Sequence, residues 1–168
     1  AEYQLEENET RGSQLEMLKK LELTKEMTEE LFYYAYDKNI GIFSTAFDIP
    51  NLNFLQSIGQ NVFKIPSGEI NNLPLLRQVG RVGKKTILST GMSNLAEIQD
   101  AIKILCESGL SKNLVTILHC TSAYPTPFDE VNLLALKTIR DTFGLEVGYS
   151  DHTLGIEVPI AAVALGAI

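Results

Sequence analysis

Short apolar runs alternate with longer amphipathic segments along most of this chain, and this alternation constrains the fold more than any other feature. Each run finishes in a small polar residue, a glycine, a lysine or a histidine. We predict five strands, over residues 42–45, 62–67, 86–90, 115–121 and 145–150. The segments between them are too long for hairpins, so we expect parallel strands joined by right-handed helical crossovers.

Two α/β architectures fit this pattern: an open doubly wound sheet, and part of an eight-stranded (β/α)8 barrel of the TIM type. We favour the barrel, because all five predicted strands end in polar groups, whereas a doubly wound sheet gathers such groups at one switch point. Residues 1–23 are predicted to form a polar lead-in with a loop and a short helix, and residues 24–168 a partial barrel. On this interpretation the chain begins within a loop and ends before another strand.

The predicted helices have recognisable ends. Thr24 is placed to cap the first long helix. Asn94 and Glu97 have the spacing of a reciprocal capping box at the start of another. The helix that follows the second predicted strand is expected to stop at Gly80 and Gly83.

Composition excludes several classes of protein. With 168 residues, of which 45% are hydrophobic, the chain is long enough to bury a core. No apolar run approaches the roughly 20 residues that a bilayer requires, and a net charge of -7 argues against a nucleic-acid partner. Cys106 and Cys120 follow no metal-binding spacing, so we expect reduced thiols in a cytoplasmic protein.

Four motifs together resemble one known family. They are Lys-Ile-Pro-Ser-Gly-Glu at 64–69, Leu-Ser-Thr-Gly-Met at 88–92, His-Cys-Thr-Ser-Ala-Tyr-Pro-Thr-Pro at 119–127 and Gly-Tyr-Ser-Asp-His-Thr at 148–153. In this order they resemble the sialic acid synthases, a family that includes N-acetylneuraminate, legionaminate and pseudaminate synthases. The likeness runs over residues 24–168.

The resemblance implies a fold and an assembly. Members of the family have a (β/α)8 barrel followed by a small antifreeze-like domain, and residues 40–168 would supply the third to seventh strand units. The first two strands, the eighth strand and the antifreeze-like domain would then be absent from this chain. The resemblance also implies a homodimer of the full-length protein.

The resemblance implies a reaction as well. In N-acetylneuraminate synthase, phosphoenolpyruvate condenses with N-acetylmannosamine to give N-acetylneuraminate and phosphate. The legionaminate and pseudaminate synthases, our alternative, use a 6-deoxy-diacetamido sugar. Such chemistry needs a cradle for a multiply charged anion, a Lewis acid on the aldehyde oxygen, and a carboxylate that orients hydroxyls or moves a proton.

Lys64 is the first candidate, because a lysine within an apolar strand is costly unless its ammonium group meets an anion. The resemblance implies that Lys64 contacts phosphoenolpyruvate and is catalytic. In the alternative interpretation, its side chain extends to the barrel rim or pairs with a carboxylate. Hydroxyls at predicted strand ends match family positions that line the phosphoenolpyruvate pocket: Thr45, Ser67, Ser89, Ser122 and Ser150. Ser122 departs from the asparagine of some members.

His152 is the predicted metal ligand, for Mn2+ or alternatively Mg2+ or Co2+, and Asp151 beside it is expected to tune or orient the site. The resemblance places a second histidine ligand on the eighth strand, beyond Ile168. Glu69 and Tyr124 match residues that meet the sugar, and Glu69 is our catalytic carboxylate. If Glu69 does not act on the substrate, it would be an exposed acidic residue of a loop, or a negative charge that stabilises a helix N-terminus.

Three other interpretations differ from these assignments. His119 and Cys120 are rejected as a nucleophilic pair, because adjacent strand residues point to opposite faces; a pocket-shaping histidine and a structural cysteine are expected instead. Lys64 would form a Schiff base if the protein were a class I aldolase. A non-catalytic barrel fragment or assembly module, with open sheet edges, is the third alternative.

Overall fold

A computed structural model describes residues 14–168, which belong to two compact units, Ala1–Ile42 and Phe43–Ile168. The described part of the first unit holds two helices, α2 (Gln14–Leu21) and α3 (Lys25–Asp37). The predicted cap is confirmed, since the Thr24 side chain accepts a hydrogen bond from the Met27 amide at 3.2 Å. The part of the predicted lead-in at 1–13 lies outside the described residues.

The second unit is built on a four-stranded parallel sheet in the order β1-β2-β3-β4. Its strands are β1 (Val62–Ile65), β2 (Lys85–Ser89), β3 (Val115–Cys120) and β4 (Glu146–Ser150). The helices are α4 (Ile49–Ser57), α5 (Leu73–Val82), α6 (Leu95–Glu107), α7 (Ala135–Phe143) and α8 (Glu157–Ala164), and short 3-10 turns form at Ser67–Glu69, Lys112–Leu114 and Phe128–Glu130. No helix among residues 14–168 is long and apolar enough to span a bilayer.

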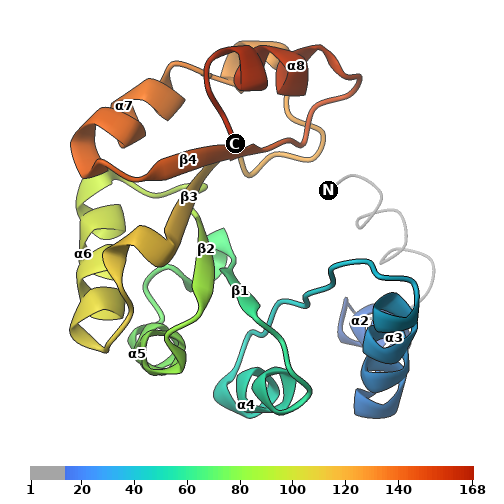
Figure 1. Ribbon diagram of the computed structural model, residues 1–168. Helices are drawn as coiled ribbons and strands as arrows, with labels where there is room; N and C mark the ends of the chain where they lie inside the picture. Colours follow the sequence, from blue (N-terminus) through green and yellow to red (C-terminus); the bar gives the residue numbers. More distant parts are fainter. Residues whose placement is uncertain (1–13) are drawn as a thin grey trace. The chain divides into compact units, whose positions relative to one another are not determined.

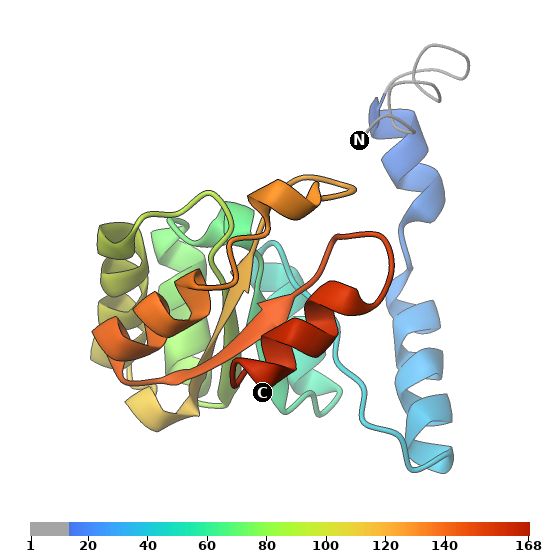
Figure 2. The same cartoon turned by 90° about the horizontal axis from the view of Figure 1, so that it is seen from above.

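The sheet has two chemically different faces. One, the helix face, carries side chains that are at most 2% exposed: Phe63, Ile65, Leu88, Ile117 and Val147. Figure 1 shows α5, α6 and α7 along this side of the sheet, and Figure 2 shows the same layer from above. The opposite face, the site face, carries Lys64 and the other residues of alternate parity. Burial on the helix face therefore fixes which side chains remain on the site face.

One predicted strand is wrong. Residues 42–45 do not join the sheet, and the described residues form four strands rather than five. The side chain of Gln60, which is 3% exposed, takes the place of a neighbouring strand. Its Oε1 accepts from the Ser44 amide at 2.8 Å and its Nε2 donates to the Ser44 carbonyl at 2.9 Å. Because one amide side chain satisfies both backbone groups, the segment stays extended without a ladder.

Besides the Thr24 cap, two predicted helix ends are correct and one is wrong. Asn94 and Glu97 form the predicted capping box, in which the backbone amide of Asn94 donates to Glu97 Oε2 at 2.8 Å. Gly83 ends α5 in the left-handed conformation, as predicted. Gly80, predicted as a stop, lies inside α5, where a Cβ would come within 2.7 Å of the Leu105 carbonyl oxygen. Its role is the close approach of α5 to α6.

Candidate active site

The parallel register collects the predicted residues on the site face. Lys64 of β1 pairs with Ile87 of β2, and Ser89 lies two residues after Ile87 on β2. Cys120 pairs with Ser150 across β3 and β4. Since paired residues of parallel strands point to the same side, Lys64, Ser89 and Ser150 share one face, with Cys120 among them. The carboxyl ends of parallel strands lie toward the same edge of the sheet, and β3 and β4 run three residues further than β1, so these side chains lie toward that edge.

Beyond the strand ends, two hydroxyls and a thiol converge on Gly91. The Gly91 amide donates to Ser67 Oγ at 2.9 Å, and Ser67 Oγ lies 3.3 Å from Cys120 Sγ. A Cβ on Gly91 would meet Ser67 Oγ at 3.0 Å and Cys120 Sγ at 3.2 Å, and would clash with Ser122 Oγ. Only a residue without a side chain leaves this polar cradle open. The hydroxyls of Ser67 and Ser122 therefore lie on the same side of Gly91.

Lys64 is half-buried on β1. Within residues 14–168 its ammonium group makes no ion pair. The alternative in which a carboxylate neutralises Lys64 therefore has no support in the described residues. A positive charge on a face lined with hydroxyls is suited to an anionic ligand.

Glu69 lies at the end of the 3-10 turn that follows β1. Its Oε2 accepts from Asn72 Nδ2 at 2.6 Å, and Asn72 Oδ1 in turn accepts from the Leu75 amide and caps α5. The carboxylate is half-buried and is oriented by the residue that begins the next helix. This contact accounts for one carboxylate oxygen and positions the group near the helix N-terminus.

His152 is held by the loop that follows β3. Its Nδ1 lies 2.6 Å from the Thr121 carbonyl oxygen, and its own carbonyl accepts from the Thr126 amide at 2.8 Å. A carbonyl oxygen only accepts, so Nδ1 carries the hydrogen and Nε2 of the neutral ring keeps a lone pair. The ring packs against Tyr124, with centroids 4.0 Å apart. Two predicted residues from different strand units thus lie in contact.

This arrangement suits a metal-ligating histidine, whose second ring nitrogen ordinarily donates to a carbonyl or carboxylate. Within residues 14–168 no cluster of three or more His, Cys, Asp or Glu side chains is placed to hold a metal ion. Asp151, beside His152, is itself held by its neighbour Thr153. Its Oδ1 accepts from the amide and hydroxyl of Thr153, at 3.0 and 2.8 Å. Burial, followed by the charge and hydrogen bond of Asp151, raises the pKa of Tyr149 to about 12.

Thr45 lies before α4, in the segment that forms no strand. It is half-buried in the extended segment anchored by Gln60. No hydrogen bond to another predicted residue is found for Thr45 among the described residues. Its side-chain contacts therefore do not identify it as part of the site.

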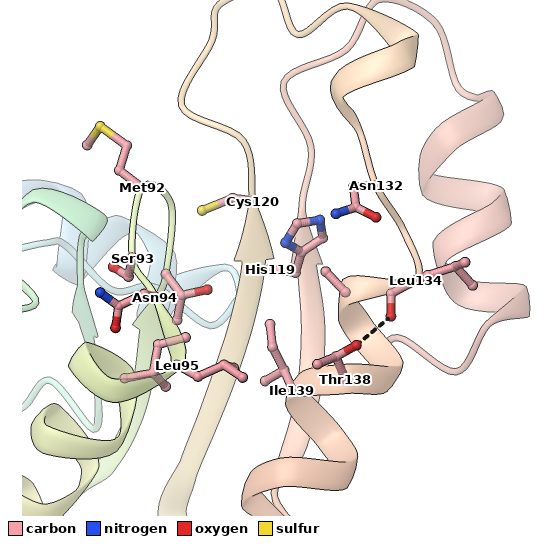
Figure 3. A pocket seen from close by; sticks show the side chains of 13 residues that line it. Met92, Ser93, Asn94, Leu95, His119, Cys120, Asn132, Leu134, Thr138 and Ile139 are labelled. Atoms are coloured by element: carbon pink, nitrogen blue, oxygen red, sulfur yellow. Dashed lines mark hydrogen bonds between the residues drawn. The ribbon is translucent and has the colours of Figure 1, made fainter.

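A pocket of about 540 Å³ opens between the first turns of α6 and α7 and the loops that precede them, and Cys120 is among its lining residues. Figure 3 shows His119 and Cys120 leaving the end of β3 in opposite directions, His119 toward Asn132 and Cys120 toward the loop with Met92 and Ser93. The rejection of a His119–Cys120 pair is therefore supported. His119 Nε2 lies 2.9 Å from the Val131 carbonyl oxygen, and the residue is half-buried. None of the predicted site residues lines this pocket.

Sequence reasoning missed Cys120 and Gly91 as members of the site. The sequence predicts only a structural role for Cys120, yet its thiol contacts Ser67, and the residue is 7% exposed. The pairing of Cys120 with Ser150 places both on one face. The signal was the register between β3 and β4, which a single sequence does not specify.

Comparison with known proteins identifies relatives over nearly the whole chain. The chain is 50% identical to the N,N'-diacetyllegionaminic acid synthase of Campylobacter jejuni over 167 residues, covering 99% of this chain and 50% of that protein. It is 46% identical to the N,N'-diacetyllegionaminic acid synthase of Legionella pneumophila, covering 99% of this chain and 48% of the relative. The chain therefore spans about half the length of these relatives.

A solved structure agrees with these likenesses. The N-acetylneuraminic acid synthetase of Leptospira borgpetersenii, crystallised with citrate, superposes with a TM-score of 0.86 at 38% identity, covering 95% of this chain and 56% of that one. The parallel sheet with its helices and this likeness confirm the predicted α/β fold of the TIM-barrel type. The sequence profile of the NeuB family matches residues 1–168. The chain therefore belongs to the NeuB family, and the predicted resemblance to the sialic acid synthases is confirmed.

Proposed function

We propose that this chain forms part of a synthase that condenses phosphoenolpyruvate with an N-acetylated amino sugar and releases phosphate. Family membership carries the proposal. The site face adds support, because Lys64 and several hydroxyls lie at the strand ends where a multiply charged anion would be held.

The reaction forms a carbon–carbon bond between C3 of phosphoenolpyruvate and the aldehyde carbon of the open-chain sugar. The aldehyde oxygen takes up a proton and becomes a hydroxyl, water adds at C2, and phosphate leaves with cleavage of its C–O bond. Lys64 and Ser67 would bind the anionic substrate, while Glu69 would orient a sugar hydroxyl or the water. Ser89, Ser122, Ser150, Thr45 and Tyr124 complete the proposed substrate contacts.

His152 would supply one ligand to a divalent metal ion, and a second histidine ligand is expected on the eighth strand. A bound Mn2+, or Mg2+ or Co2+, supplies Lewis-acid polarisation of the aldehyde oxygen. The contribution of this chain is to hold the imidazole in one tautomer through Thr121, with Nε2 available for ligation.

Two acceptor sugars are candidates. The identities of 50% and 46% to N,N'-diacetyllegionaminic acid synthases favour a 6-deoxy-diacetamido sugar. N-acetylmannosamine, the acceptor implied first by the motifs, is the second candidate, in line with the 38% identical N-acetylneuraminic acid synthetase.

Phosphate release from phosphoenolpyruvate by the full-length protein, with Mn2+ and each candidate sugar, tests the proposal. We expect release that requires both sugar and metal and is abolished in His152→Ala. His119→Gln is the matched control, because it removes the other histidine but retains a donor for the Val131 carbonyl. Sugar-independent release, or full activity of His152→Ala, would refute the metal assignment. Trapping of Lys64 by borohydride in the presence of pyruvate would instead support the aldolase.

A further inference from the structure

We propose that Cys120 is a positioning residue, whose thiol donates to Ser67 Oγ and thereby directs the Ser67 hydroxyl hydrogen toward the phosphoenolpyruvate anion. This inference rests on the proposed function. It concerns the contact between Ser67 Oγ and Cys120 Sγ, which are 3.3 Å apart with either atom able to donate.

Counting the hydrogens at Ser67 leaves two arrangements. Its hydroxyl has one hydrogen and two lone pairs, and one lone pair already accepts from the Gly91 amide at 2.9 Å. If Ser67 donates to sulfur, its remaining lone pair faces the site and repels an anion. If Cys120 donates to Ser67, both lone pairs are occupied and the hydroxyl hydrogen is left for the ligand.

The second arrangement is favoured when an anion is bound. Sulfur is a weak acceptor, whereas hydrogen bonds to charged acceptors are about twice as strong as neutral ones. Ser67 therefore gains more by donating to the anion than to Cys120. The thiol hydrogen then has Ser67 Oγ as its acceptor.

The backbone keeps the thiol in place. Cys120 is the last residue of β3, is paired with Ser150 of β4 and is 7% exposed. Gly91 leaves room for the thiol and the two hydroxyls, which a Cβ would displace. The position of sulfur is therefore set by the sheet, while Ser67 lies in the 3-10 turn after β1.

The test measures binding of phosphoenolpyruvate to the full-length protein by calorimetry, alongside the KM for each substrate. Cys120→Ala is expected to raise the Kd for phosphoenolpyruvate about fivefold, the size of one neutral hydrogen bond. The KM for the sugar is expected to stay within about twofold. Cys120→Ser retains a donor and is expected to bind within about twofold of the parent, and Cys106→Ala, which removes the thiol in α6, serves as the control.

A double-mutant cycle then asks whether Cys120 acts through Ser67. In a Ser67→Ala background, Cys120→Ala should have no further effect on the Kd. An undiminished effect there, an unchanged Kd in Cys120→Ala, or a Cys120→Ser variant as weak as Cys120→Ala would overturn the proposal. If Cys120→Ala does not fold, Cys120→Val, which lacks a donor and suits a strand, takes its place.

Direct binding separates this inference from the proposed function. A parent protein that binds phosphoenolpyruvate but releases no phosphate with any acetamido sugar would refute the reaction, while the variants would still decide the role of Cys120. A parent that does not bind phosphoenolpyruvate would overturn both.

Discussion

Replacing Gln60 by alanine should release the segment around Ser44 without unfolding the sheet. The Gln60 side chain makes two hydrogen bonds to Ser44, through its Oε1 and its Nε2, at 2.8 and 2.9 Å. Each is worth about 1 kcal/mol in net terms, so the loss is about 2 kcal/mol. Because 1.4 kcal/mol corresponds to a factor of ten, local opening should become about 30-fold more frequent.

Amide hydrogen exchange of the full-length protein, followed by mass spectrometry of a peptide covering residues 42–48, measures this change. We expect exchange at Ser44 to accelerate by about the same factor when reclosing is faster than exchange. Gln56→Ala is the matched control, since Gln56 is an exposed glutamine on α4. Acceleration below about threefold, or equal acceleration in the control, would refute the account of Gln60 as a substitute for a neighbouring strand.

Two further predictions concern packing and titration. Gly80→Ala should lower the free energy of unfolding by about 1–3 kcal/mol, because the added Cβ would lie 2.5 Å from Ser108 Cβ. Thermal unfolding measures this as a lower midpoint, and an unchanged midpoint would contradict the close approach of α5 and α6. Tyr149 should titrate near pH 12, measured as the difference in tyrosinate absorbance between the parent and Tyr149→Phe. The raised pKa of Tyr149 stabilises the folded state fully at pH values below the ordinary tyrosine pKa of 10.0. This stabilisation is lost as the pH rises from 10 toward 12, because over that range the native state retains the proton and the unfolded state does not. A pKa near 10 for Tyr149 would show that its hydroxyl is not desolvated.

Local signals in the sequence correctly predicted four of the strands and the starts of α3 and α6. The Thr24 cap and the Asn94–Glu97 box were correct because their donors and acceptors lie within three residues along the chain. The run at 42–45 had the composition of a strand but formed none. Its backbone partner is the side chain of Gln60, 16 residues away from Ser44, and no local pattern encodes that contact.

In the candidate site, too, the sequence identified residues but not the contacts between them. Motif resemblance named Ser67, Ser122 and His152, and the structure adds contacts that orient Ser67 and His152, with Ser122 beside Gly91. These contacts are made across different strand units, so they depend on register and on the paths of loops rather than on spacing.

The sequence by itself determined the alternation of strands and helices, the polar strand ends and the family, because each follows from residue types in order along the chain. Only the tertiary structure decided that Gln60 replaces a strand, that Gly80 brings two helices together, and that Cys120 faces Ser67. The physical reason is that these contacts join residues far apart in sequence, and a shift of one residue in strand register would turn Cys120 to the opposite face.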